Sequence, residues 1–308
     1  MIATMNKSNA YHTSVLLQSC IDHLNIQPNG IYVDLTFGGG GHSAEILKNL
    51  NKDGKLFSFD QDEDAQKNIL KDKRFTLIPH NFRFVKNYLR LYGVTKVKGI
   101  LGDLGVSSHQ FDEASRGFSI RFNADLDMRM NRQSEITAKK IVNEYSEKNL
   151  IKIFREYGEV INAAKISKLI VEARVIKPIS TTDELKEVIK PGTPKFEAHK
   201  YHAKVFQALR IEVNQEIESL KECLTQCVDL LEKDGTMVMI SYHSLEDRLV
   251  KNVLKSGNVD GIEKKDVVYG STTKVFKILS TRPILPDENE IKTNTRSRSA
   301  KLRVGVKL

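Results

Sequence analysis

The sequence predicts an α/β protein in which a doubly wound parallel sheet is interrupted by an inserted helical domain. Two observations carry this prediction. Short apolar segments with strand periodicity alternate with amphipathic helical segments up to about residue 112, and the same alternation resumes at about residue 204. Between these points helical periodicity continues without a strand pattern. We therefore expect a sheet domain in two parts, 1–112 and 204–308, with a helical domain, 113–203, inserted between them.

The individual elements follow from apolar periodicity and from the capping and turn residues at their ends. Strands are predicted at 31–36, 55–60, 74–80, 97–108, 236–244, 274–279 and 300–306. Helices are predicted at 12–24, 42–51, 62–71, 82–91, 136–146, 148–158, 160–175, 181–190 and 244–254, and 204–232 forms one long helix or two abutting helices. No internal repeat is visible.

The first strand runs into four consecutive glycines, which is the clearest local signal in the chain. Apolar and polar residues alternate over 31–35, as in a strand. Gly38 to Gly41 allow positive φ and remove every Cβ that would keep a ligand away from the backbone. The helix that follows would begin with unpaired amides near His42 and Ser43, which favour polar or anionic groups. A ligand is expected to lie against this turn.

Two classes of cofactor use such a Rossmann-like turn. Gly39, Gly41 and Ala44 match the dinucleotide pattern GxGxxG/A, and Asp60 at the end of the second strand would accept both ribose hydroxyls in either class. Asp34 separates the classes, because its carboxylate would repel a pyrophosphate and attract the ammonium of an amino-acid group. S-adenosylmethionine carries that ammonium and no phosphate. We favour it over a nicotinamide or flavin dinucleotide.

Several polar residues are predicted to meet at one edge of the sheet. Asp34, Asp60 and Asp103 each end a predicted strand, and the strand at 236–244 delivers Tyr242 and His243 to the same edge. Ligands of doubly wound sheets bind at the carboxyl ends of the strands. The shared position makes a binding site more plausible than three unrelated loop carboxylates.

Composition and charge restrict the class of protein and its partners. Of 308 residues, 48 are Lys or Arg and 39 are Asp or Glu, so the formal charge is +9. No acidic residue follows Glu290, while six basic ones do, which suits contact with a polyanion. Nucleic acid is favoured over a membrane, since no apolar helical face accompanies these residues. No apolar run is long enough to span a bilayer, and the first residues lack the apolar core of a signal peptide, so a cytoplasmic protein is expected.

The segments DLTFGGGGHS, LGDLGVSSHQFD, RGFS, LDMRM, FQALRIEVNQE, ISYHSLEDR and TNTRSRSAKLR occur in this order along nearly the whole chain. In this the sequence resembles the MraW family of methyltransferases. The resemblance implies an S-adenosylmethionine methyltransferase domain interrupted by a helical domain. It further implies methyl transfer to N4 of a cytidine in the decoding centre of bacterial 16S ribosomal RNA, on free RNA or on the small ribosomal subunit. The oligomeric state is left open, a homodimer included.

Carried over residue by residue, the resemblance implies a set of cofactor contacts. The glycine amides would approach the methionine carboxylate, Asp60 the ribose, and Phe82 or a neighbour would cover the adenine. Together with Asp34, predicted above from its charge, the expected cofactor-binding residues are Gly40, Gly41, His42, Asp60, Phe82, Asp103 and Gln110.

An exocyclic cytosine amine is a poor nucleophile, because its lone pair is delocalised into the ring. An acceptor must therefore be held against its N–H groups. We hypothesise that Asp103, or the loop Gly105 to Ser108, supplies this acceptor; an equal alternative is that Asp103 only positions the cofactor. The base must leave the RNA stack, and Phe118, Phe122 and Tyr242 are candidates to stack on it.

The remaining candidates concern RNA contact and metal binding. His243 with Glu246 has the spacing of a short metal motif, but the sequence offers no third ligand, so no catalytic metal is predicted. The residues expected to contact the substrate are Arg129, His243, Arg248, Arg296 and Arg298. Two other functions compete with the methyltransferase: a nicotinamide-dependent oxidoreductase, which the glycine turn would also suit, and a noncatalytic RNA-binding module.

Overall fold

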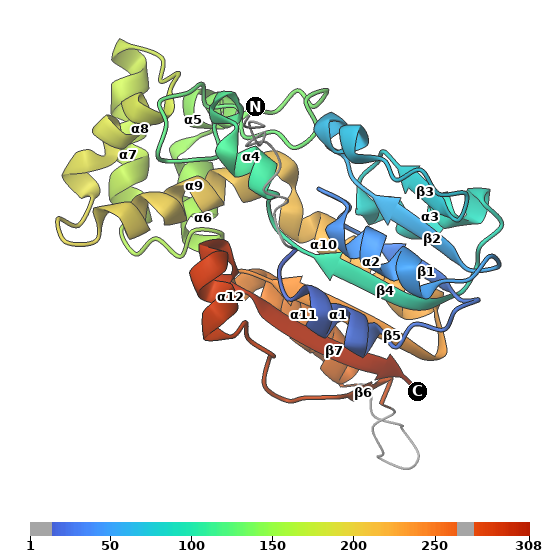
Figure 1. Cartoon of the computed structure of the whole chain (residues 1–308). Helices are drawn as coiled ribbons and strands as arrows, with labels where there is room; N and C mark the ends of the chain where they lie inside the picture. Colours follow the sequence, from blue (N-terminus) through green and yellow to red (C-terminus); the bar gives the residue numbers. More distant parts are fainter. Residues whose placement is uncertain (1–13, 264–273) are drawn as a thin grey trace, which may run out of the picture.

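The computed structural model describes residues 14–263 and 274–308, and in this part of the chain one sheet of seven strands forms the centre (Figure 1). The strand order is β3-β2-β1-β4-β5-β7-β6. The first five strands in this order run parallel, while β7 is antiparallel to both β5 and β6. The strands are β1 Ile31–Asp34, β2 Lys55–Phe59, β3 Phe75–Ile78, β4 Val97–Asp103, β5 Leu231–Ser241, β6 Phe276–Ile278 and β7 Lys301–Lys307. The predicted doubly wound α/β fold is confirmed.

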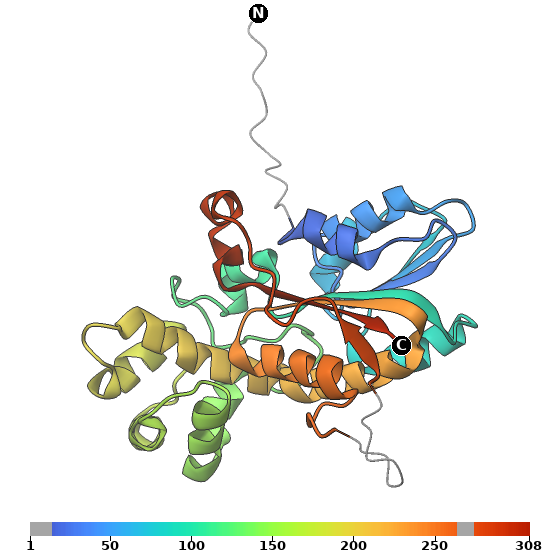
Figure 2. The ribbon, with the colours of Figure 1, turned by 90° about the horizontal axis from the view of Figure 1, so that it is seen from below.

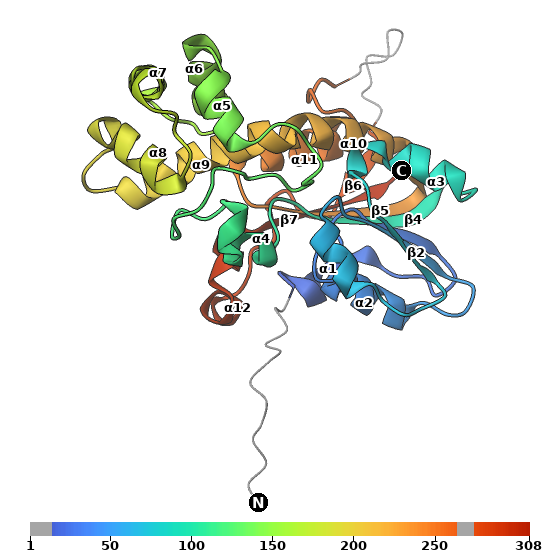
Figure 3. The same cartoon turned by 90° about the horizontal axis from the view of Figure 1, so that it is seen from above.

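Helices cover both faces of the sheet (Figures 2 and 3). The helices α1 and α2 lie on one face, and α3, α10 and α11 lie on the other. Each face has its own apolar cluster, because each of these helices turns a stripe of aliphatic side chains toward the strands. The bounds are α1 Leu17–Leu24, α2 Gly41–Asn49, α3 Val85–Leu91, α10 Glu216–Leu230 and α11 Ser244–Ser256.

A separate group of helices extends beyond the sheet between β4 and α10 (Figure 1). Side-chain caps begin several of them: Thr137, Ser146 and Thr181 each accept a hydrogen bond from an amide of the first turn. Their aliphatic faces form a third apolar cluster. The helices are α4 Ser108–Asp112, α5 Ala138–Glu144, α6 Glu147–Glu156, α7 Ala163–Ile176, α8 Thr182–Ile189 and α9 Ala198–Asn214, with the 3₁₀ turns η3 Ala114–Arg116 and η4 Lys190–Gly192. The predicted helical insertion is present.

The domain boundary predicted at residue 204 falls inside α9. The buried side chains of this helix, among them Val205, Phe206 and Leu209, pack in the helical cluster. The helix ends instead at Gln215, whose backbone is left-handed with φ 49° and which separates α9 from α10. Of the two alternatives for 204–232, two abutting helices are therefore correct.

The predicted helix at 62–71 is wrong. Only the 3₁₀ turn η1 Glu63–Asn68 forms there, and it ends at Ile69. Asp62 and Asp64 are bonded to Arg116 of η3, and Ala65 packs in the apolar cluster that α1 and α2 also line, so ion pairs and apolar packing together hold this segment. Two further 3₁₀ turns and one helix complete the chain: η2 Phe82–Phe84, η5 Thr295–Ser299 and α12 Glu288–Thr293. Within the described residues, no helix combines the length and apolar character needed to cross a membrane.

The strand register brings the predicted polar residues to one edge. Asp34 lies opposite Leu101 of β4, and Asp103 lies opposite Ile240 of β5. Asp60 follows the last residue of β2, and its amide bonds to the carbonyl of Ile78. Because these strands are parallel, the carboxylates share the edge at which their carboxyl ends meet.

Candidate cofactor and active site

Asp34 is fully buried beneath the glycine turn. Its Oδ2 accepts a hydrogen bond of 2.6 Å from the Ser43 hydroxyl, and its Oδ1 accepts one of 3.0 Å from the Thr36 amide. Burial raises the pKa of this carboxyl, and His42 and the bond from Ser43 oppose the rise. The structure thus uses Asp34 to fasten the turn and the start of α2 to β1. Its predicted contact with a methionine ammonium stays a prediction, and such a contact needs the turn to open, because no surface of Asp34 is exposed.

Asp60 holds the glycine turn from the other side. Its Oδ2 accepts from the Gly38 amide at 2.8 Å, and its Oδ1 accepts from the Asp62 amide at 2.9 Å. Burial raises the pKa of this carboxyl to about 6. A Cβ added at Gly38 or Gly39 would have no atom within 4 Å, so these two residues border open space next to Asp60. The ribose of a cofactor is expected in this space.

At Gly40 and Gly41, unlike at Gly38 and Gly39, a side chain would collide with neighbouring atoms. Gly40 has φ 78°, and an added Cβ would lie 3.0 Å from the Phe37 ring; at Gly41 it would lie 2.1 Å from the Ser14 hydroxyl. The His42 side chain is buried, with Nε2 3.1 Å from the Val15 carbonyl. The Gly40 amide donates to the Phe37 carbonyl at 2.7 Å, so a cofactor contact of this turn falls to the backbone amides of Gly41 and His42 and stays a prediction.

Asp103 ends β4 beside the loop that carries the predicted acceptor. Its Oδ1 accepts from the Tyr242 hydroxyl at 2.7 Å, and its amide donates to the Thr36 hydroxyl at 2.7 Å. Burial raises the pKa of Asp103 to about 6, although His42 and the bond from Tyr242 lower it. No hydrogen bond from the described residues reaches Oδ2. Asp103 thus combines a fixed position with one free acceptor atom.

Phe82 and Gln110 lie at the outer side of this edge. Phe82 is partly buried in η2 and packs on the core below α10. Gln110 is buried in α4, where its Oε1 accepts from the Ser107 amide at 3.0 Å and its Nε2 donates to Asp62 at 2.7 Å. The carboxamide of Gln110 keeps one N–H for a ligand.

Comparison with known proteins decides which cofactor class this edge serves. A model of the MraW methylase family matches residues 9–308. The chain belongs to the MraW methylase family. A protein of Flavobacterium johnsoniae named ribosomal RNA small subunit methyltransferase H is 53% identical over 304 residues, which are 99% of this chain and 100% of that protein. The protein of the same name from Cytophaga hutchinsonii is 54% identical over 296 residues, 96% of this chain and 98% of that protein.

Membership in the MraW family confirms the resemblance predicted from the sequence. The chain is an S-adenosylmethionine-dependent methyltransferase. A nicotinamide-dependent oxidoreductase and a noncatalytic RNA-binding module do not agree with this membership. The preference for the sulfonium cofactor, which rested on Asp34 and the glycine turn, led to the correct class.

Glu216, His243 and Glu246 form a largely buried polar cluster at the start of α11. His243 caps α11, and its Nε2 lies 3.3 Å from Glu246 Oε1 without the alignment of a hydrogen bond. Glu216 supplies the third group that the sequence did not reveal, within 4.8 Å of the other two. Both oxygens of Glu216, however, accept from the Arg210 guanidinium at 2.9 Å. This fixed positive charge opposes a metal cation, and the absence of a catalytic metal stays a prediction.

The predicted substrate-binding arginines differ in how many hydrogen bonds and ion pairs they already make within the chain. Arg129 donates to both oxygens of Asp127 and to the carbonyls of Arg132 and Ser134, so four of its five N–H groups hold its own loop. The structure gives this residue a structural role, and phosphate contact by it stays a prediction.

The other three lie on the surface. Arg296 is partly exposed, pairs with Asp112 and lies 5.9 Å from the Phe111 ring centroid. Arg248 and Arg298 are exposed and make no hydrogen bond or ion pair within the described part of the chain. These two residues have the freedom that phosphate contact requires.

The three aromatic candidates for base stacking also differ in how far their rings are exposed or engaged. Phe118 is 4% exposed and belongs to the apolar cluster of the helical insertion, so it presents no face to a base. Tyr242 is engaged with Asp103. Phe122 is 39% exposed, with the Arg121 guanidinium 5.9 Å from its ring centroid, and is the most exposed of the three candidates.

Sequence reasoning missed three residues of the site. Thr36 and Ser43 bond to Asp34, and both flank the glycines in the DLTFGGGGHS segment, so their position beside Asp34 was a usable signal. Arg116 in the RGFS segment bonds to Asp62, which lies 54 residues away. No local pattern could have shown that partner.

Proposed function

We propose that this MraW methylase transfers the methyl group of S-adenosylmethionine to N4 of a cytidine in 16S ribosomal RNA of the small subunit, in the cytoplasm. The observation that carries the proposal is the fixed Asp103 carboxylate, with Oδ2 free, at the same sheet edge as the glycine turn and Asp60. The relatives named ribosomal RNA small subunit methyltransferase H support the choice of RNA.

The residues supply positioning and an acceptor. The sulfonium cofactor, when bound, supplies an electrophilic methyl group and a leaving group. Asp60 and the glycine turn would hold the sugar and amino-acid ends of the cofactor at the same sheet edge as Asp103. The ionised Asp103 would accept an N–H of the cytosine amine through Oδ2, which would make the nitrogen more nucleophilic and orient it for methyl transfer. Tyr242 keeps the carboxylate in this orientation through Oδ1.

Mass spectrometry of nucleosides tests the substrate. 16S ribosomal RNA is isolated from a strain that lacks the protein and from the same strain complemented with the wild-type chain or with Asp103→Asn. We expect N4-methylated cytidine to be missing at one position in the deletion strain, to return with the wild-type chain and to stay low with the variant. Unchanged modification in the deletion strain would refute the assignment.

Arg248 and Arg298, which are exposed and make no hydrogen bond or ion pair within the described part of the chain, are expected to contribute phosphate contacts. Replacing both with Gln should weaken binding of small-subunit RNA and make the plot of log affinity against log salt shallower by about 1.4 to 1.8, since each lost contact removes roughly 0.7 to 0.9. Filter binding over a salt series measures the slope. The matched control is Lys71→Gln with Lys73→Gln, two exposed lysines that precede β3 at the opposite edge. An equal slope for the arginine variant and the wild type would exclude phosphate contact.

A further inference from the structure

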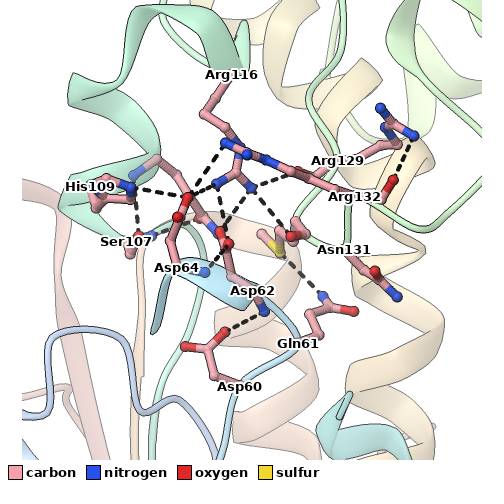
Figure 4. Close-up of polar contacts among 12 residues, drawn as sticks. Asp60, Gln61, Asp62, Asp64, Ser107, His109, Arg116, Arg129, Asn131 and Arg132 are labelled. Atoms are coloured by element: carbon pink, nitrogen blue, oxygen red, sulfur yellow. Dashed lines mark hydrogen bonds and ion pairs between the residues drawn. The ribbon is translucent and has the colours of Figure 1, made fainter. Parts of the chain in front are cut away.

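Arg116 makes five hydrogen bonds close to the cofactor edge (Figure 4). Its side chain is 3% exposed. One terminal nitrogen donates to Asp62 Oδ1 at 3.2 Å and to Asp64 Oδ2 at 3.0 Å. The other donates to Asp62 Oδ2 at 2.8 Å and to the carbonyls of Arg129 and Met130 at 2.9 and 3.2 Å.

The bonds from Arg116 to Asp62 connect it to Asp60, the residue expected to bind the ribose. Asp62, which is paired with Arg116, donates its amide to Asp60 Oδ1 at 2.9 Å. The same Asp62 carboxylate accepts from Gln110 at 2.7 Å. Two of the expected cofactor contacts are therefore held by one residue: Asp60 by the amide of Asp62, and Gln110 by the Asp62 carboxylate, which Arg116 fixes in place.

The bonds from Arg116 to two backbone carbonyls connect it to the LDMRM segment, residues 126–130. The carbonyls of Arg129 and Met130 are bonded to Arg116, and the Met130 amide donates to Asn214 of α9 at 2.7 Å. Gln61, between Asp60 and Asp62, donates to the Met130 sulfur at 3.4 Å, and its oxygen accepts from Asn81 beside Phe82 at 3.0 Å. The segment is thus bonded to the residues that follow Asp60 (Figure 4).

A buried ion pair contributes little net stability relative to apolar packing, but removing one partner leaves an uncompensated charge. What this pair provides is position, since two parallel N–H···O bonds fix both distance and orientation. We propose that Arg116 is a positioning residue for S-adenosylmethionine: it touches no reacting group, but it holds Asp60, Gln110 and the LDMRM segment in the arrangement that binds the cofactor. This inference rests on the proposed function, because it takes the cofactor site as given.

The test measures affinity for S-adenosylhomocysteine by calorimetry on the full chain. Arg116→Lys and Arg116→Gln are expected to raise the Kd about tenfold or more, with Lys the milder change, because a point charge keeps the attraction to Asp62 but loses the fork. The single-turnover rate at saturating cofactor should stay within a few-fold of wild type, since Asp103 is not moved. Asp62→Asn, which weakens the same pair from its other side, should reproduce the loss of affinity if Arg116→Gln does not fold.

Arg303→Gln is the matched control. Arg303 is 10% exposed and bonds to both oxygens of Asp247, at 2.6 and 3.1 Å, on the far side of β5 from β2. The Arg303→Gln variant should have a lowered melting temperature, as Arg116→Gln should, but an unchanged Kd for S-adenosylhomocysteine. Equal Kd values for Arg116→Lys, Asp62→Asn and the wild type would overturn the proposal, as would a matching loss of affinity in Arg303→Gln. No binding by the wild-type chain would instead overturn the proposed function itself.

Discussion

Replacing Asp103 with Asn is expected to lower the single-turnover rate of methyl transfer, at saturating cofactor and RNA, by about two orders of magnitude or more, the usual size of a positioned acid–base group. Asn is close in shape and preserves an oxygen for the Tyr242 hydroxyl, but it lacks the charge that accepts strongly from the amine. Rapid-quench measurement of a single turnover isolates this step from cofactor binding. If the rate is unchanged while the cofactor Kd rises, Asp103 positions the cofactor and has no part in the transfer.

The pH profile of the same rate provides an independent readout. Burial raises the pKa of Asp103 to about 6. A protonated carboxyl is uncharged and accepts much more weakly from the amine, so the rate should fall as the pH drops below about 6. Tyr242→Phe removes a hydrogen bond that lowers this pKa, and the fall should then begin at higher pH. Asp103→Asn should show no such fall. Saturating cofactor is needed because the pKa of Asp60 is also raised to about 6.

The free energy of unfolding should change with pH in the opposite direction to the methyl-transfer rate. A carboxyl whose pKa is raised in the folded chain binds its proton more tightly there than in the unfolded chain. Its contribution to the free energy of unfolding is therefore complete below the ordinary value of 3.8 and is lost as the pH rises through about 6. Between these values the chain loses stability while it gains activity, which is typical of groups placed for function.

Asp60→Ala is expected to raise the Kd for S-adenosylmethionine by about 100-fold or more. Each ribose hydroxyl would lose a hydrogen bond to a charged acceptor, worth roughly 1.5 kcal/mol or more, and 1.4 kcal/mol corresponds to tenfold in affinity. The variant also releases the Gly38 amide, which loosens the turn. Calorimetry with the cofactor and with S-adenosylhomocysteine measures both values.

Asp72→Ala is the control for this substitution. Asp72 pairs with Arg74 just before β3, at the opposite edge of the sheet. Its loss should leave both Kd values unchanged. A Kd within about twofold of wild type for Asp60→Ala would mean that the ribose lies elsewhere, because the predicted loss is far larger.

Much of the sheet domain was predictable, because its signals are local. Strand and helix periodicity located the five parallel strands, and the rule that ligands bind where parallel strands end brought Asp34, Asp60 and Asp103 together. The failure at 62–71 has a clear cause. The segment has the composition of a helix start, but Asp62 and Asp64 are drawn into bonds with Arg116, and the chain forms a short 3₁₀ turn instead.

By itself the sequence determined the doubly wound fold, the helical insertion and the glycine turn, which follow from residue types at short spacings. The same residues favoured S-adenosylmethionine over a dinucleotide, and family membership decided between them. Only the tertiary structure decided which charged groups neutralise one another: Arg129 with Asp127, Glu216 with Arg210, Arg116 with Asp62. A guanidinium is equally suited to a phosphate or to a carboxylate, so its role depends on which anion the fold brings within about 3 Å. For Arg116 and Asp62, that proximity is created by the packing of two segments far apart in the chain.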